Sequence, residues 1–204
     1  MKRMVKCMEQ KENVDAGVLQ IPEGVKALSD CAYADRRDLK AVIIPEGVTR
    51  IGNHAFRGCI NLKRVVLPQT VKEIGDCAFM DCVKLKHLDL PNEVSKIGNL
   101  AFLSCKSLPK VKLSENIKFL GKQAFRSCHA IRDVVIPEGL SEIPEGLFAD
   151  CIELYRVVLA DSVKSIGANA FAHCEKLNEV NFPNHLFKVD ISAFHEVQDV
   201  RFSS

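Results

Sequence analysis

The chain has 204 residues, enough for one ordinary domain or two small ones with a sizeable apolar core. Apolar residues make up 47% and charged residues 26%, close to the average of soluble globular proteins. The formal net charge of +2 is too small to predict nucleic acid or an anionic membrane as partner, and no apolar run approaches the ~20 residues that membrane insertion requires.

Residues 1–20 precede the regular part of the chain and are predicted to form an N-terminal cap, with Val18 and Leu19 joining the first strand. Lys2, Arg3 and Lys6 begin this segment, but the apolar region of a signal peptide is missing. As written, the chain is therefore expected in the cytoplasm. A chain whose leader had been removed would look the same, so the cell surface and secretion stay open as alternatives.

From Ile21 onward the chain divides into rows of 23 residues without insertion. We predict that residues 21–204 form one domain of eight 23-residue repeats, the last of them degenerate. A single repeat cannot cover its own apolar side, so copies must stack into a solenoid whose matching positions form columns through the core. The aromatic column is the clearest: Tyr33, Phe56, Phe79, Phe102, Phe125, Phe148, Phe171 and Phe194.

Each row predicts the same local structure. The Val-x-Leu phrase at its end alternates apolar and polar positions and predicts a short strand, and stacked strands would form a parallel sheet. The Pro-Glu-Gly that follows, as at 22–24, is typical of a turn. The segment AFRGCINL, residues 55–62, places apolar groups at i, i+1, i+4 and i+7, which predicts one or two helical turns on the opposite wall.

The row LPQTVKEIGDCAFMDCVKLKHLD, residues 67–89, resembles the leucine-rich repeat, and it is most similar to the BspA-type class. The resemblance holds over roughly residues 18–202. It implies an α/β repeat fold: a curved, right-handed leucine-rich-repeat solenoid, with the parallel sheet on the concave face and short helical turns on the convex side. Proteins of this class are typically bacterial or protozoan surface proteins that bind other proteins, which implies adhesion as a function.

The nine cysteines are predicted to be mostly core residues. Six of them recur at 23-residue intervals in the same apolar stripe as Phe and Leu, where a reduced thiol acts as a compact apolar group. Occasional disulfides along this column are the alternative, and Cys7 and Cys31 have no evident partner. The column consists of Cys59, Cys82, Cys105, Cys128, Cys151 and Cys174.

The sequence contains two possible metal sites, and neither is favoured. His54, Cys59, Cys77 and Cys82 offer four zinc ligands in adjacent rows, but the Cys59 column is expected to face inward and the His54 column outward. Acidic residues after the strands could share Ca²⁺, although a solvated rim explains them more simply. These are Glu23, Glu46, Glu115, Glu138 and Asp161. We predict no cofactor.

The sequence gives no indication of an enzyme. The six histidines fall at six different phases of the repeat, so they build no common site. The nucleophile elbow, the phosphate-binding loops and the HExxH zinc motif are all missing from the sequence.

Outward positions of the strands are the candidate binding site, because the core does not need them. Their charges are mixed, which argues against nucleic acid, and apolar residues among them are typical of a protein-binding face. The alternative is that β-branched residues there simply favour strand geometry. The predicted face consists of Ile43, Arg64, Val66, His87, Asp89, Lys110, Lys112, Asp133, Val135, Arg156, Val158, Glu179 and Asn181.

The last row is a second candidate surface, since an uncapped repeat leaves apolar groups open. Phe194, Val197, Val200 and Phe202 are expected to be partly exposed there and to support end-to-end self-association, and truncation of a longer array is the alternative explanation. The favoured function is a non-catalytic protein-binding module, acting in surface adhesion or as an intracellular scaffold. The alternatives are a structural or self-associating array without a distinct ligand and, less favoured, a zinc-binding protein.

Overall fold

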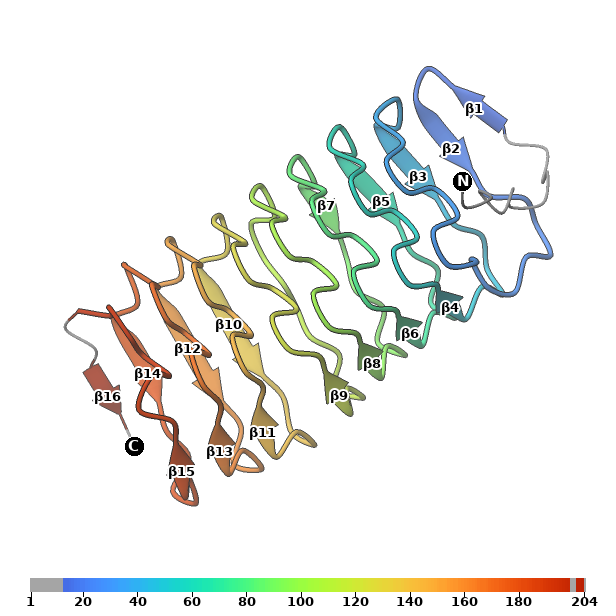
Figure 1. Cartoon of the computed structure of the whole chain (residues 1–204). Coiled ribbons are helices and arrows are strands. Elements are labelled where there is room, and N and C mark those ends of the chain that lie inside the picture. The colour runs from blue at the N-terminus through green and yellow to red at the C-terminus, as the bar shows by residue number, and fades with distance from the viewer. Residues whose placement is uncertain (1–12, 199–200, 204) are drawn as a thin grey trace, which may run out of the picture.

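The chain winds into a solenoid in which each 23-residue repeat makes one turn, and successive turns lie side by side along a single axis (Figure 1). This computed structural model describes residues 13–198 and 201–203. Among these residues no helix is assigned. The predicted parallel-sheet solenoid is confirmed, and the predicted convex helical turns are wrong.

The first wall consists of the strands predicted from the Val-x-Leu phrase. They pair in parallel with an offset of 23 residues, so that Val42 lies beside Val65 and Val134 beside Val157, and the offset is 22 only in the last pair, Glu179 with Arg201. At the N-terminal edge β1 (Asn13–Asp15) pairs antiparallel with β2 (Val18–Gln20) and covers its free side. The other strands are β3 (Ala41–Ile43), β5 (Arg64–Val66), β7 (His87–Leu88), β10 (Asp133–Ile136), β12 (Arg156–Leu159), β14 (Glu179–Asn181) and β16 (Arg201–Ser203).

A second wall of two-residue strands was not predicted. In each of its first six strands the first residue lies at least partly in solvent, and the second, an Ile or Leu, is buried in the core. A strand of two residues contains only one apolar–polar alternation, which is too short to be recognised in the sequence. The strands are β4 (Arg50–Ile51), β6 (Glu73–Ile74), β8 (Lys96–Ile97), β9 (Phe119–Leu120), β11 (Glu142–Ile143), β13 (Ser165–Ile166) and β15 (Lys188–Val189).

The third wall is a run of tight turns where helical turns were expected. In the first seven turns two positions four residues apart have a positive φ near 60°, and in the last turn Glu196 alone has one; a right-handed helix cannot contain such residues. Alternate N–H groups also donate to the next coil, as from Phe56 to the Ala78 carbonyl at 2.8 Å. The left-handed columns are Cys31, His54, Cys77, Leu100, Gln123, Gly146 and Asn169, and Asp35, Gly58, Asp81, Ser104, Ser127, Asp150, His173 and Glu196.

The core is a set of continuous columns enclosed by the three walls. Rings of the aromatic column stack nearly parallel, with centroids 5.2 Å apart between Phe102 and Phe125 and an interplanar angle of 3°. Six phenylalanines in this column are completely buried, and so are the six column cysteines. The regular 23-residue spacing of apolar residues in the sequence therefore corresponds to physical contact between neighbouring coils.

Two prolines divide the walls. In regular coils the residue before the first-wall strand donates its N–H to the coil before, as from Lys86 to the Lys63 carbonyl at 3.0 Å. Pro109 occupies this position and has no N–H, and the first wall is split into two sheets between β7 and β10. Pro144 likewise replaces the glycine whose N–H joins neighbouring coils on the second wall, and that wall is split between β9 and β11.

Candidate functional site

The outward side chains of the first wall form two ladders along the solenoid, which together we call the strand face. The strand predicted in the fourth repeat is not formed, so Lys110 and Lys112 lie in the gap between β7 and β10. Parallel pairing places Arg64 beside His87 in one ladder and Ile43 beside Val66 in the other. Ten of the thirteen predicted residues are exposed, and Val158, Glu179 and Asn181 are half-buried. The exposed ten are Ile43, Arg64, Val66, His87, Asp89, Lys110, Lys112, Asp133, Val135 and Arg156.

Exposed apolar side chains are concentrated at two places on the strand face. Ile43 is 41% exposed and Val66 37%, and they are direct neighbours on β3 and β5. Val135, 59% exposed, is paired with Val158 on β10 and β12. The charged residues of the two intervening coils separate these patches, so the face consists of two apolar areas bordered by charge.

Charge is distributed unevenly along the strand face. Its N-terminal half presents Arg64, Lys110 and Lys112 with Asp89 as the one carboxylate, whereas its C-terminal half alternates in sign. Arg156 Nε lies 3.5 Å from Glu179 Oε2 on the neighbouring strand, and both side chains are about half exposed. An ion pair in so much solvent contributes about 0–1 kcal/mol, so it orients the two side chains more than it stabilises the fold.

Two hollows lie on or beside this face. The first, of about 430 Å³, opens over β5 and β7 and is lined by Arg64, Val66, Gln69, His87 and Asp89, among others. The second, of about 410 Å³, lies near the C-terminal end of the face around Tyr155 and Lys176. Both are open depressions, which suits the contact surface of another macromolecule.

Tyr155 is a residue that the sequence argument missed. Its side chain is 46% exposed, and its hydroxyl donates to Glu179 Oε1 at 3.3 Å. It directly precedes β12, in a column that Lys40, Lys63 and Lys86 occupy in earlier coils. The signal was present in the sequence as an aromatic residue in a basic column, one position outside the predicted strand residues.

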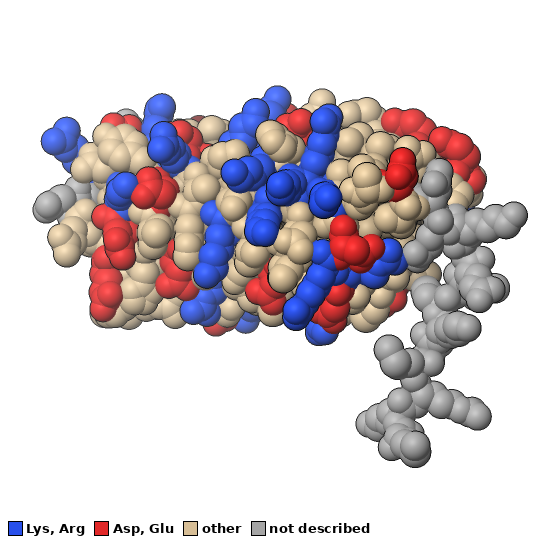
Figure 2. All heavy atoms as spheres, turned by 90° about the horizontal axis from the view of Figure 1, so that it is seen from above, with Lys and Arg blue, Asp and Glu red and all other residues tan. Residues whose placement is uncertain are grey.

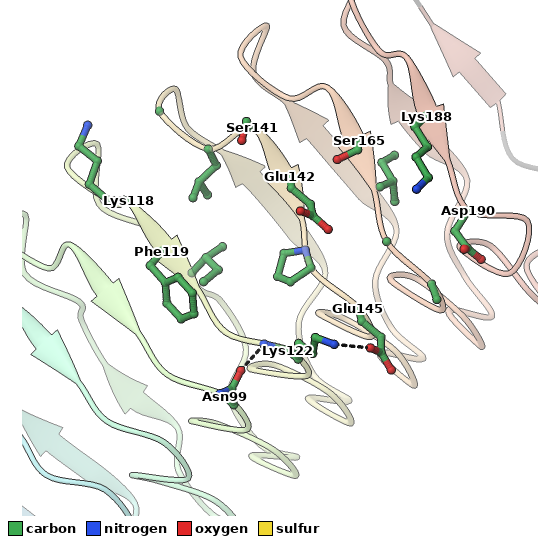
Figure 3. Close-up of a pocket in the computed structure, with 17 residues that line it drawn as sticks. Asn99, Lys118, Phe119, Lys122, Ser141, Glu142, Glu145, Ser165, Lys188 and Asp190 are labelled. Atoms are coloured by element: carbon green, nitrogen blue, oxygen red, sulfur yellow. Dashed lines mark hydrogen bonds and ion pairs between the residues drawn. The ribbon is translucent and has the colours of Figure 1, made fainter.

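A further hollow, of about 620 Å³, lies on the second wall where Pro144 interrupts the sheet. Figure 3 shows Phe119, Glu142 and Lys188 around it, with Lys122 Nζ paired to Glu145 Oε2 at 2.9 Å. Phe119 is 46% exposed. This groove therefore combines one accessible aromatic ring with both signs of charge, and no prediction pointed to it because the second wall itself was unexpected.

The four zinc candidates do not converge. In the described part of the chain, no three His, Cys, Asp or Glu side chains form a group that could hold a metal ion. Cys59 and Cys82 are completely buried, and each thiol donates to a main-chain carbonyl, that of Tyr33 at 3.1 Å and of Phe56 at 3.2 Å. The zinc alternative is therefore left without a site, although Cys77 is also buried and His54 Nδ1 is buried without a partner.

Two of the five acidic residues after the strands have structural partners. Glu138 accepts hydrogen bonds from the main-chain N–H groups of Asp161 and Ser162, both at 3.1 Å, and Glu46 accepts one from Gln69 at 3.2 Å. These two carboxylates thus stabilise the turn of the next coil, a role that requires no calcium.

The described cysteines are all free thiols, as the repeat pattern predicted for the core column. Each column thiol donates to the carbonyl of the aromatic residue 26 positions earlier, as from Cys128 to Phe102 at 3.2 Å. Burial raises the pKa of Cys59, Cys128 and Cys174 to about 12. Cys31 is exposed, and Cys7 lies outside the described residues.

Comparison with known proteins identifies the repeat. A family model described as "BspA type Leucine rich repeat region" matches six copies over residues 26–155 and 141–202. The comparison with curated proteins finds no relative of this chain. Among the described residues, no helix is long and apolar enough to cross a membrane.

Several solved structures are similar. The leucine-rich repeat protein of T. pallidum shares 32% identity over 79% of this chain and 78% of its own, with a TM-score of 0.73. A leucine-rich repeat protein from Bacteroides ovatus shares 21% identity over 98% of this chain and 69% of its own, with a TM-score of 0.70. A pneumococcal vaccine antigen shares 16% identity over 91% of this chain and 61% of its own, with a TM-score of 0.56. The last two likenesses show the fold alone.

Proposed function

Because the chain belongs to the BspA-type leucine-rich repeat family, we propose that it is a non-catalytic protein-binding module whose ligand docks on the strand face. The observation that carries this proposal is the pair of apolar patches, Ile43 with Val66 and Val135 with Val158, at strand positions that face water. Leucine-rich repeat proteins are generally binding modules of this kind.

The composition of the strand face supports a protein ligand. Protein interfaces combine an apolar centre with a polar rim, and their strongest contacts often come from Tyr and Arg. Arg64 and Arg156 border the two apolar patches, and Tyr155 adds an exposed ring beside the second. The β-branched residues also suit strand geometry, but that preference does not account for the charged border or for Tyr155.

Charge reversal on the strand face should abolish ligand binding without unfolding the protein. In the triple variant Arg64→Glu, Lys112→Glu and Arg156→Glu, three exposed side chains change sign, and among the described residues only Arg156 loses an ion pair, a solvent-exposed one. We expect the variant to lose the ligands that wild-type protein retains in a pull-down and to keep the wild-type melting temperature within about 2 °C, since surface substitutions rarely change stability by more than about 0.5 kcal/mol.

The matched control places the same charge change on the second wall. Lys72→Glu, Lys118→Glu and Lys164→Glu also alter three exposed cations, and none of these belongs to an ion pair among the described residues. This variant should retain the ligands. Binding that survives the strand-face changes, or that both variants lose equally, would show that the proposed face is wrong. Surface adhesion and an intracellular scaffold would use the same face, so the experiment applies to either setting.

A second candidate function, end-to-end self-association, is supported by the last coil. Phe187, Val189 and Ile191 are 78%, 43% and 102% exposed on or beside β15, which has no paired strand on its outer side among the described residues. Phe194 and Val197 are half-buried against the core, and the side chains of Val200 and Phe202 lie outside the described residues. The open apolar surface is therefore on the second wall of this coil.

Light scattering over a protein concentration series tests this candidate. We expect the average mass to rise with concentration, and the double variant Phe187→Lys and Ile191→Lys to stay monomeric, because two charges would be buried in the contact. The control is Val135→Lys, which places a charge at an equally exposed apolar site on the strand face. A wild-type protein that stays monomeric throughout the series would exclude self-association through this end.

A further inference from the structure

Six exposed lysines gather where the turn wall meets the beginning of the first-wall strands. Lys40, Lys63 and Lys86 occupy the same column in three successive coils, and Lys84, Lys106 and Lys110 surround them. Figure 2 shows Lys and Arg side chains concentrated in one patch on this side of the solenoid, toward its N-terminal half. We call these six residues the lysine cluster.

The lysine cluster combines two features: its lysines stand in successive coils, and none of them has an acidic partner among the described residues. Lys72, Lys118 and Lys164 on the second wall also lack an ion pair, but Ser95 and Ser141 separate them in their column. Elsewhere in the described chain, ion pairs join neighbouring coils, such as Arg57 with Asp35 at 3.2 Å and Arg126 with Asp150 at 2.8 Å. No described ion pair includes any of the six lysines. Lys84 contacts a neutral side chain instead, donating to Asn61 Oδ1 at 2.8 Å.

This arrangement opposes folding. Neighbouring coils are about 4.8 Å apart at paired strands, so equivalent lysines of successive coils begin from adjacent backbone positions. Like charges placed opposite each other on neighbouring strands are destabilising. Alternating signs along the column would remove this repulsion, because they would produce the inter-coil ion pairs that are seen elsewhere in the molecule. A column of unpaired lysines is accounted for by an external anion that neutralises them.

The composition of the cluster indicates which anion. Protein interfaces are depleted in Lys and depend on aromatic or Arg anchors, and single-stranded nucleic acid requires aromatic rings on which bases stack. No large exposed aromatic side chain lies in the four repeats that carry the cluster, residues 21–112, so its ammonium groups act as point charges without a stacking ring beside them. A stiff polymer that carries anions along its length needs only such charges and loses little conformational freedom on binding.

We propose that the lysine cluster binds a sulfated polysaccharide. The polymer would lie along the solenoid axis across the coils of Lys40, Lys63, Lys86 and Lys110, a distance of about 14 Å for three coil spacings. This surface shares Lys110 with the strand face and otherwise lies beside it, and the proposal does not rest on the protein-binding function. The net charge of +2 gives no sign of this site, because acidic residues elsewhere in the chain balance the positive charge of the cluster.

Binding to immobilised heparin tests the proposal with the full chain. The variant Lys63→Glu and Lys86→Glu reverses two central charges, and Lys164→Glu and Lys188→Glu makes the same change on the second wall. We expect the dissociation constant to rise at least tenfold for the cluster variant and less than twofold for the control. The slope of log affinity against log salt concentration should fall in magnitude by about two for the cluster variant, since two contacts are lost.

Three further probes identify the source of the negative charge. Desulfated heparin should bind at least tenfold more weakly than heparin, and poly-glutamate and duplex DNA of equal charge should bind more weakly than heparin. Circular dichroism confirms that both variants are folded. The proposal is overturned if wild-type protein does not bind heparin, if the two variants lose affinity equally, or if poly-glutamate or DNA binds as tightly as heparin does.

Discussion

Replacing Phe125 with Ala is expected to lower the free energy of unfolding by about 3–5 kcal/mol, the usual effect of truncating a completely buried aromatic side chain. Phe125 is fully buried, and it is stacked between Phe102 and Phe148 with centroid distances of 5.2 and 5.4 Å. Its removal leaves a cavity that neighbouring coils cannot fill, because the hydrogen bonds between coils hold their spacing.

The position of Phe125 in the middle of the array makes this effect large. Each coil of a solenoid is stabilised by its two neighbours, so a defect in a central coil weakens two interfaces, whereas a defect in an end coil weakens one. Stacked aromatic pairs also contribute about 0.5–1.5 kcal/mol beyond the area they bury, and Phe125 takes part in two such pairs.

Urea denaturation followed by circular dichroism measures the change. The control is Phe119→Ala. Because Phe119 is 46% exposed on the second wall, this substitution should lower the free energy of unfolding by less than about 1 kcal/mol. Equal losses for the two variants would contradict the assignment of the aromatic column to the core, whatever the absolute values are.

The protein is expected to lose stability steeply above pH 9, because its six column thiols are buried in the protonated form. Desolvation raises the pKa of Cys59, Cys128 and Cys174 from 9.0 to about 12, and it raises the pKa of Cys82, Cys105 and Cys151 well above 9.0. The same thiols titrate near pH 9 when the chain is unfolded.

The direction of the effect follows from proton linkage. Between pH 9 and 12 the folded state binds more protons than the unfolded state, so the free energy of unfolding falls as pH rises. Below pH 9 the thiols are protonated in both states, so they cause no loss of stability there. At pH 10 the burial of the protonated thiols of Cys59, Cys128 and Cys174 lowers the free energy of unfolding by about 1 kcal/mol each, and Cys82, Cys105 and Cys151 act in the same direction.

Urea titrations at a series of pH values between 7 and 11 test this expectation. The variant Cys105→Ala and Cys128→Ala removes two of the six titrating groups, and the fall in stability per pH unit above pH 9 should decrease by about one third. The lower absolute stability of this variant does not affect the comparison, since the slope is what is measured. Stability that is independent of pH between 8 and 10 would be incompatible with buried, protonated thiols.

Much of the fold could be read from the sequence because a solenoid repeats one environment many times. The phases of Phe125, Cys128 and their equivalents predicted a common core, and the structure places both columns there. The strand face was predictable for the same reason, since Val134 and Val157 face inward and fix their neighbours as outward.

The turn wall could not be predicted because its apolar spacing fits a helix as well as a series of turns. What decides between them is the left-handed conformation at positions such as His54 and Gln123, and the hydrogen bonds that alternate N–H groups make to the next coil. A helix would direct those N–H groups within the coil. The neighbouring coil competes for them, and its presence is not visible in the local sequence.

The sequence by itself determined which side chains are buried and that the chain stacks coil upon coil, because the 23-residue phase is recorded in every repeat. The tertiary structure decided which groups of neighbouring coils lie side by side. It forms the second wall, it is interrupted at Pro109 and Pro144, and it places Lys63 beside Lys86 without acidic partners. These features depend on distances between residues far apart in the chain. Spacing along the sequence fixes the first kind of property, and only the stacked coils supply the neighbours that create the second.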